Sequence, residues 1–216
     1  MRVVNVSVAR AIWLFDTVEL NPRGLDINPI YVAVKNRYGF LTPKTREDVL
    51  NPTDGVKFEH GSFVPDGAEN VDVSFTVYND GLIADTKANT SCSDAFLLDV
   101  TSFVKKQHGL SFDPSMVLNY RHASSLVVES EKGLSRMSEL LAEISVQLKT
   151  ETGKGYEASG ITVAFDPAEN RDGLGPFIFE RRSNAAFYRN RFFSSAPLKT
   201  ESHIALLKKL ESLMTT

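Results

Sequence analysis

Residues 177–193, FIFERRSNAAFYRNRFF, combine four arginines and six aromatic residues with a single carboxylate, Glu180. The segment is therefore basic within a chain whose formal net charge is −3. Its first half alternates as a strand does, which would place Phe177, Phe179 and Arg181 on one face and the residues between them on the other. We interpret the chain before residues 177–193 as a structural scaffold. An amphipathic helix is expected after residue 193.

The second half of the segment is turn-like and interleaves rings with guanidinium groups. Arginine and aromatic residues are enriched at protein interfaces. Arginines also fork onto phosphate, and rings stack on unpaired bases. A purely structural role, with the later rings packed beneath the last helix, is the third interpretation. The residues chosen as a candidate binding surface are Arg182, Tyr188, Arg189, Arg191 and Phe192.

Arg181 is expected to differ from the other arginines. If Phe177 and Phe179 face the core, alternation sends Arg181 inward at the end of the strand. A buried guanidinium needs a carboxylate or carbonyl partner, because an unpaired buried charge is costly. We therefore predict a structural role for Arg181.

The composition is that of a globular protein. The chain has 216 residues, of which 42% are hydrophobic and 24% charged, and these values predict a single globular domain over residues 1–216. The sequence pI near 5.8 argues against nonspecific coating of nucleic acid. No window reaches the roughly 18 apolar residues of a membrane span, so we expect no membrane contact and a cytoplasmic location.

The strands expected from alternation arrive mostly in runs, and Asn79-Asp80-Gly81 has the composition of a hairpin turn with positive φ. This order favours an α+β fold with a mostly antiparallel sheet and amphipathic helices packed against it, ending in a C-terminal helix. The expected strands are 3–20, 56–64, 71–78, 82–87, 120–128, 161–165 and 176–182.

Four helices are expected from apolar spacing and from their terminal residues. They are a short helix over 30–38, one beginning near Ser91 or Ser93 and ending at Gly109, one over 134–149, and a last one beginning at Thr200. The third has a regular apolar stripe: Leu134, Met137, Leu141, Ile144 and Leu148. The stripe of the last is His203, Leu206, Leu207, Leu210, Leu213 and Met214.

No motif in the chain carries recognisable catalytic or metal chemistry. The single cysteine, Cys92, excludes an internal disulfide and a cysteine-based zinc site. The four histidines share no metal-ligand spacing, so we expect neither a metal nor a cofactor. His203 has two interpretations, a general base at a helix start or a packed core histidine, and its place in the apolar stripe favours the second.

We therefore expect a non-catalytic binding or assembly protein that acts through protein–protein contacts and associates with copies of itself. The alternative is a phosphate-recognising module that binds nucleic acid or nucleotide through 177–193. A second alternative is an enzyme whose site is assembled from scattered residues, with Arg121, His122, Glu180 and His203 as examples.

Overall fold

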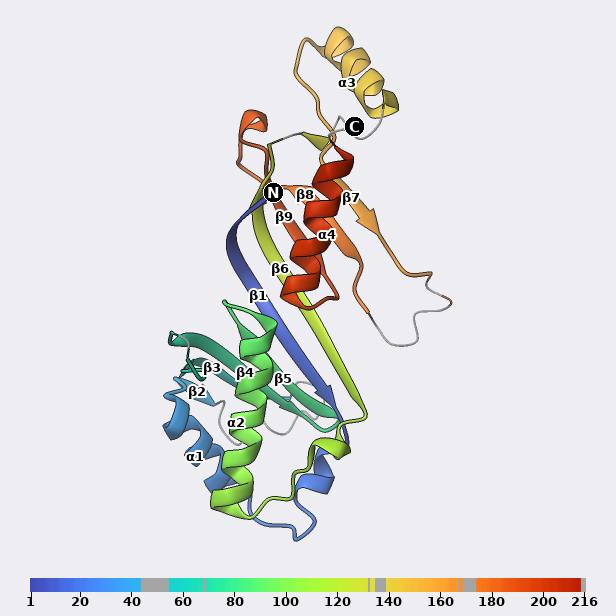
Figure 1. Ribbon diagram of the computed structural model, residues 1–216. Coiled ribbons are helices and arrows are strands. Elements are labelled where there is room, and N and C mark those ends of the chain that lie inside the picture. The colour runs from blue at the N-terminus through green and yellow to red at the C-terminus, as the bar shows by residue number, and fades with distance from the viewer. Residues whose placement is uncertain are drawn as a thin grey trace. The chain divides into compact units, whose positions relative to one another are not determined.

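A computed structural model describes residues 1–43, 55–67, 69–131, 133–134, 139–166, 168 and 174–214 (Figure 1). The chain divides into two compact units. Unit 1 consists of Met1–Ser7 and Ser124–Thr216, and unit 2 of Val8–Ala123. The expectation of a single domain over residues 1–216 stays a prediction.

The strands form a nine-stranded sheet in the order β2-β3-β4-β5-β1-β6-β9-β8-β7, and the strand pairs whose register is described are antiparallel. The strands are β1 (Arg2–Leu14), β2 (Thr42–Pro43), β3 (Val56–Phe63), β4 (Val71–Tyr78), β5 (Gly81–Thr86), β6 (Asn119–Glu129), β7 (Gly160–Val163), β8 (Phe177–Arg181) and β9 (Arg191–Ala196).

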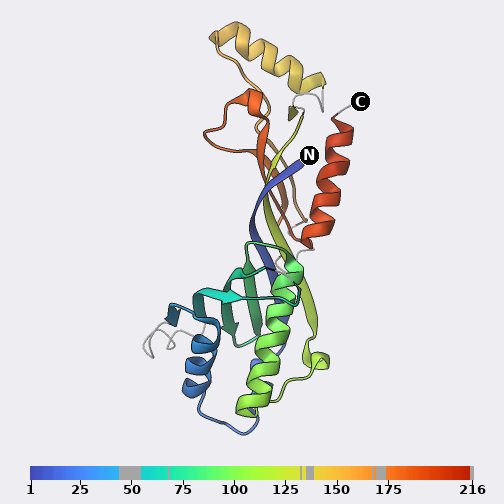
Figure 2. The same cartoon turned by 60° about the vertical axis from the view of Figure 1, so that its left-hand side comes forward.

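In the described ranges, four α-helices accompany the sheet (Figures 1 and 2). They are α1 (Asn28–Tyr38), α2 (Thr90–His108), α3 (Glu139–Thr152) and α4 (Thr200–Leu213). The predicted α+β class, the antiparallel sheet and the C-terminal helix are confirmed. Within the described ranges, no helix combines the length and the apolar character that a membrane crossing requires.

Unit 2 has its core between the helices α1 and α2 and the strands β3, β4, β5 and β1. Alternate residues of β4 face this core, which is why Val73 and Phe75 are buried while their neighbours are not. Phe96 of α2 is fully buried, and its ring contacts the rings of Tyr38, Phe40, Phe63 and Phe75. Both helices end as predicted, at Gly39 and Gly109 in the left-handed region.

The predicted hairpin joins β4 to β5, but the reason given for its glycine is wrong. Gly81 pairs with Tyr78 as the first residue of β5, and neither it nor Asn79 nor Asp80 has a positive φ. A Cβ at Gly81 would lie 2.3 Å from the carbonyl oxygen of Trp13 on the neighbouring strand. Glycine is therefore required by the close approach of two backbones and not by φ.

Unit 1 has a smaller core, in which α4 packs on β6, β9 and β8. Leu207 and Met214 are almost fully buried there, together with the stacked rings of Phe179 and Phe192, whose centroids lie 4.5 Å apart. The last helix is thus part of the core. Its buried stripe is narrower than predicted, because Leu206 and Leu213 are exposed.

Helix α3 differs most from its sequence-based interpretation. Within the described residues it begins at Glu139, and Leu134 lies before it, buried in the core of unit 1. The apolar side chains of the helix itself are exposed: 37% for Leu141, 45% for Ile144 and 39% for Leu148. Three of the five residues of the predicted stripe therefore lie on the described helix, each more than one third exposed, whereas Met137 lies outside the described residues.

Candidate functional site

Arg181, at the end of β8, has a side chain that is only 8% exposed. It forms an ion pair with Glu157, and it donates hydrogen bonds to the carbonyl oxygens of Ala158 at 3.3 Å and Phe187 at 3.2 Å. Its carbon Cζ lies 4.9 Å from the ring centre of Phe187 and 5.2 Å from that of Phe192. The prediction that Arg181 is partly buried and has carboxylate and carbonyl partners is confirmed, and its structural role stays a prediction.

These contacts join the segments around α3 to the β8–β9 connection. Glu157 and Ala158 follow α3, whereas Phe187 belongs to that connection. Gly133, which precedes α3, also lies close to Arg181. A Cβ added at Gly133 would lie 3.4 Å from Arg181 Nη2 and 3.5 Å from Asn190 Oδ1. Residues on both sides of α3, Gly133 and Glu157, therefore lie close to Arg181.

The β8–β9 connection presents the exposed half of the basic-aromatic segment. It contains a short 3-10 turn, Phe187–Arg189, after which Asn190 takes a left-handed conformation with φ 41°. Tyr188 is 80% exposed, and the Cζ of Arg189 lies 6.0 Å from its ring centre. Arg182 is also exposed.

Arg191 is less available than predicted, because it is already paired. Its Nη2 lies 2.8 Å from Glu129 Oε1, directly across the β6–β9 ladder. Glu129 also pairs with Arg2. The hydrogen bond from Arg2, and to a smaller extent that from Arg191, keeps the pKa of the Glu129 carboxyl below its ordinary value.

The assignment of Phe192 to a binding surface is wrong. The segment after Asn190 is the strand β9, where the sequence-based interpretation placed a turn. Phe192 faces the core with 0% exposure, and Arg191 and Phe193 take the other face. Of the five predicted binding residues, Arg182, Tyr188 and Arg189 remain exposed.

Two features of this site were missed in the sequence. Glu157, the partner of Arg181, lies 24 positions away from it, and no local pattern connects the two. Phe187, whose ring is half-exposed beside Arg181, lies within residues 177–193 but was not among the predicted binding residues. We name the exposed apolar stripe of α3 (Leu140, Leu141, Ile144 and Leu148) together with Phe187, Tyr188 and Arg189 the α3–loop surface.

Two of the residues suggested for an assembled enzyme site, His203 and His122, have different hydrogen-bond partners. His203 is fully buried in unit 1, with Nδ1 2.8 Å from Ser124 Oγ and Nε2 2.8 Å from Ser194 Oγ. In unit 2, His122 Nε2 lies 2.7 Å from Asp94 Oδ2, and the same carboxylate accepts a hydrogen bond from Trp13. Among the described residues, no group of three or more His, Cys, Asp or Glu side chains could hold a metal ion.

Comparisons with known proteins add little to this description. No family model matches the sequence, and no curated protein matches it. Among solved structures, the chain is similar to Methanococcus jannaschii TBP, with a TM-score of 0.47 and 13% identity over 99% of this chain and 97% of that chain. A likeness at this level carries no argument about function.

Replacing Arg181 with alanine should destabilise unit 1 by about 2–4 kcal/mol, because it leaves Glu157 and two carbonyl oxygens without their donor. Arg189→Ala is the matched control, since that guanidinium is exposed and should change the free energy of unfolding by less than about 0.5 kcal/mol. Urea unfolding of both variants measures this difference. Equal midpoints for the two variants would refute the structural role of Arg181.

His203 should make stability depend on pH. Burial lowers the pKa of His203 to about 4, whereas the unfolded chain has a value near 6.5. The stabilisation is therefore complete above about pH 6.5 and is lost as the pH falls toward 4, because the unfolded state binds the proton first. Between pH 7 and pH 5 we expect a loss of about 2 kcal/mol from this group.

Urea unfolding at both pH values tests this expectation on the wild type, on His203→Gln and on His60→Asn. His60 is exposed and has a positive φ that asparagine tolerates, so His60→Asn should keep the wild-type pH dependence. His203→Gln should reduce it. If the free energy of unfolding of His203→Gln kept the wild-type pH dependence, His203 would have the same pKa in the folded and unfolded states, contrary to this prediction.

Proposed function

We propose that this chain is a non-catalytic assembly protein that associates with copies of itself through the α3–loop surface. The observation that carries the proposal is the exposed apolar stripe of α3, on a helix whose following segment is held by the contacts of Arg181 with Glu157 and Ala158. A 14-residue helix is marginal in water unless an apolar face is packed. A partner helix would supply that packing.

The spacing of the stripe favours another helix as the partner. Within the described helix, Leu141, Ile144 and Leu148 are separated by three and four residues. This is the repeat that places apolar side chains along the seam of a left-handed helix pair. The next position in the series is Glu151, so the seam is short.

The charges beside the stripe favour a second copy of the same chain. In a paired helix the positions flanking the seam face each other and set the choice of partner. In α3 these positions are occupied by Leu140, Ser145 and Gln147, none of which is charged. Two identical helices would therefore bring no like charges together, while Glu143 and Lys149 point away from the seam.

The loop would contribute the remaining contact area. A helix of 14 residues is about 21 Å long and cannot alone bury the roughly 1,200 Å² of a stable interface. Phe187 and Tyr188 are exposed aromatic residues of the kind enriched at interface centres. We expect a reversible association that depends on protein concentration.

Phosphate recognition is the second candidate function. The observation in its favour is that Arg182 and Arg189 are exposed and that no carboxylate among the described residues is paired with either. Such binding would be weakened by salt, whereas burial of the apolar stripe would be little affected.

Sedimentation velocity over a range of protein concentrations, at low and high salt, tests the assembly. Ile144→Lys should shift the equilibrium to monomer, because it places two like charges in the seam. Val146→Lys is the matched control: Val146 is 65% exposed on the same helix but lies outside the stripe. A wild type that stays monomeric at all concentrations, or two variants that behave alike, would contradict the proposal.

A further inference from the structure

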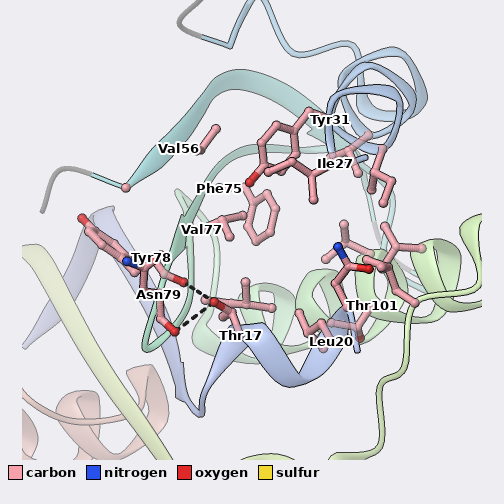
Figure 3. A pocket seen from close by; sticks show the side chains of 18 of the residues that line it. Thr17, Leu20, Ile27, Tyr31, Val56, Phe75, Val77, Tyr78, Asn79 and Thr101 are labelled. Atoms are coloured by element: carbon pink, nitrogen blue, oxygen red, sulfur yellow. Dashed lines mark hydrogen bonds between the residues drawn. The ribbon is translucent and has the colours of Figure 1, made fainter. Parts of the chain in front are cut away.

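Unit 2 contains a cavity of about 490 Å³ (Figure 3). It lies among α1, α2, the turn Thr17–Leu20 and the strands β3, β4 and β5. Its volume is within the range of roughly 300–1,000 Å³ that is typical of small-molecule sites. All of its lining residues belong to unit 2, so it is separate from the α3–loop surface.

The lining of the cavity is mostly apolar, and its described residues are uncharged. Its walls include the rings of Phe58 and Phe75 and the branched side chains of Ile30, Val34 and Val100. No aspartate, glutamate, lysine, arginine or histidine is among the described residues that line it. A charged ligand would lose its hydration there without gaining an opposite charge, so the lining selects for uncharged molecules.

Three polar side chains of the lining are already engaged by the protein. The hydroxyl of Thr17 donates to the carbonyl oxygens of Tyr78 and Asn79, both at 2.9 Å, and that of Thr101 donates to Leu97 at 2.6 Å. The amide of Asn21 is occupied by the backbone of Leu25. These groups close the wall and offer little to a ligand.

Tyr31 is different, because its hydroxyl is directed toward the cavity and forms no hydrogen bond with another described residue (Figure 3). The ring is fixed edge-on against Phe58, with the centroids 5.7 Å apart. Burial raises the pKa of Tyr31, so the hydroxyl stays protonated and can donate. One donor in an apolar chamber fits an acceptor on an otherwise apolar molecule.

We propose that this cavity binds a small, uncharged and mostly apolar molecule whose hydroxyl, ketone or ester oxygen accepts a hydrogen bond from Tyr31. The apolar part of the ligand fills the space bounded by α1, α2 and the sheet. Its binding adds a small-molecule function that self-association through unit 1 does not require.

Fluorescence titration with N-phenyl-1-naphthylamine tests the cavity, because this probe is uncharged and apolar. The charged control probe is 1-anilinonaphthalene-8-sulfonate, which has nearly the same rings and a sulfonate. The uncharged probe should bind saturably with one site per chain, and the sulfonate at least about tenfold more weakly, since no lining group neutralises it. Equal affinity for the two probes would overturn the proposal.

Two substitutions on α1 test whether the uncharged probe binds in the cavity. Val34→Phe fills the cavity from a buried lining position, whereas Val32→Phe adds the same ring at a position that is 55% exposed and outside the lining. Val34→Phe should abolish saturable binding, and Val32→Phe should leave it unchanged. Loss in both variants or in neither would show that the probe binds elsewhere. A wild type that binds no probe would show that the cavity is only a packing void.

Displacement of the bound probe tests the role of Tyr31 and does not depend on whether Val34→Phe folds. The competitors are 1-decanol and decanoate, which share one chain and differ in the charge of the head group. Decanol should displace the probe and decanoate should not. Tyr31→Phe should weaken displacement by decanol by about 2–10-fold, the range for one hydrogen bond. Displacement by both competitors alike, or no effect of Tyr31→Phe, would overturn the assignment.

Discussion

The buried guanidinium of Arg181 is the interaction on which unit 1 and its exposed surface depend. A cationic side chain that is 8% exposed is stable only where its donors are satisfied. Glu157 comes from the segment after α3, and the carbonyl of Phe187 comes from the β8–β9 connection. One charge therefore holds the base of the α3 excursion beside an aromatic loop, and neither segment needs a large apolar core of its own to stay in place.

The two units use their apolar residues in opposite ways. In unit 1, apolar side chains of α3 remain outside the core, where a second copy can reach them. In unit 2, apolar side chains line a cavity toward which the hydroxyl of Tyr31 is directed. Exposed apolar stripes favour macromolecular partners, and concave apolar pockets favour small molecules. The chain thus has two independent candidate sites, with different chemistry and with separate tests.

The sequence predicted the parts of the fold that depend on local patterns. Alternation located β4 and β8, and Gly39 and Gly109 marked helix ends correctly. It also predicted that Arg181 would be buried and paired, because strand parity sets the face of each side chain. It could not show whether the α3 stripe is covered, since exposure depends on distant segments. The same limit applied to Phe192, whose burial depends on the strand β9, and to Gly81, whose neighbour is the carbonyl of Trp13.

Amide hydrogen exchange at low and high protein concentration tests the central claim most directly. In the monomer, the amides of α3 should exchange rapidly, because an uncovered helix of 14 residues is marginally stable. At high concentration their exchange should slow, together with that of Phe187 to Arg189, while the buried helix α4 keeps its rates. Exchange in α3 that is the same at both concentrations would contradict the assignment of this helix as the surface for self-association.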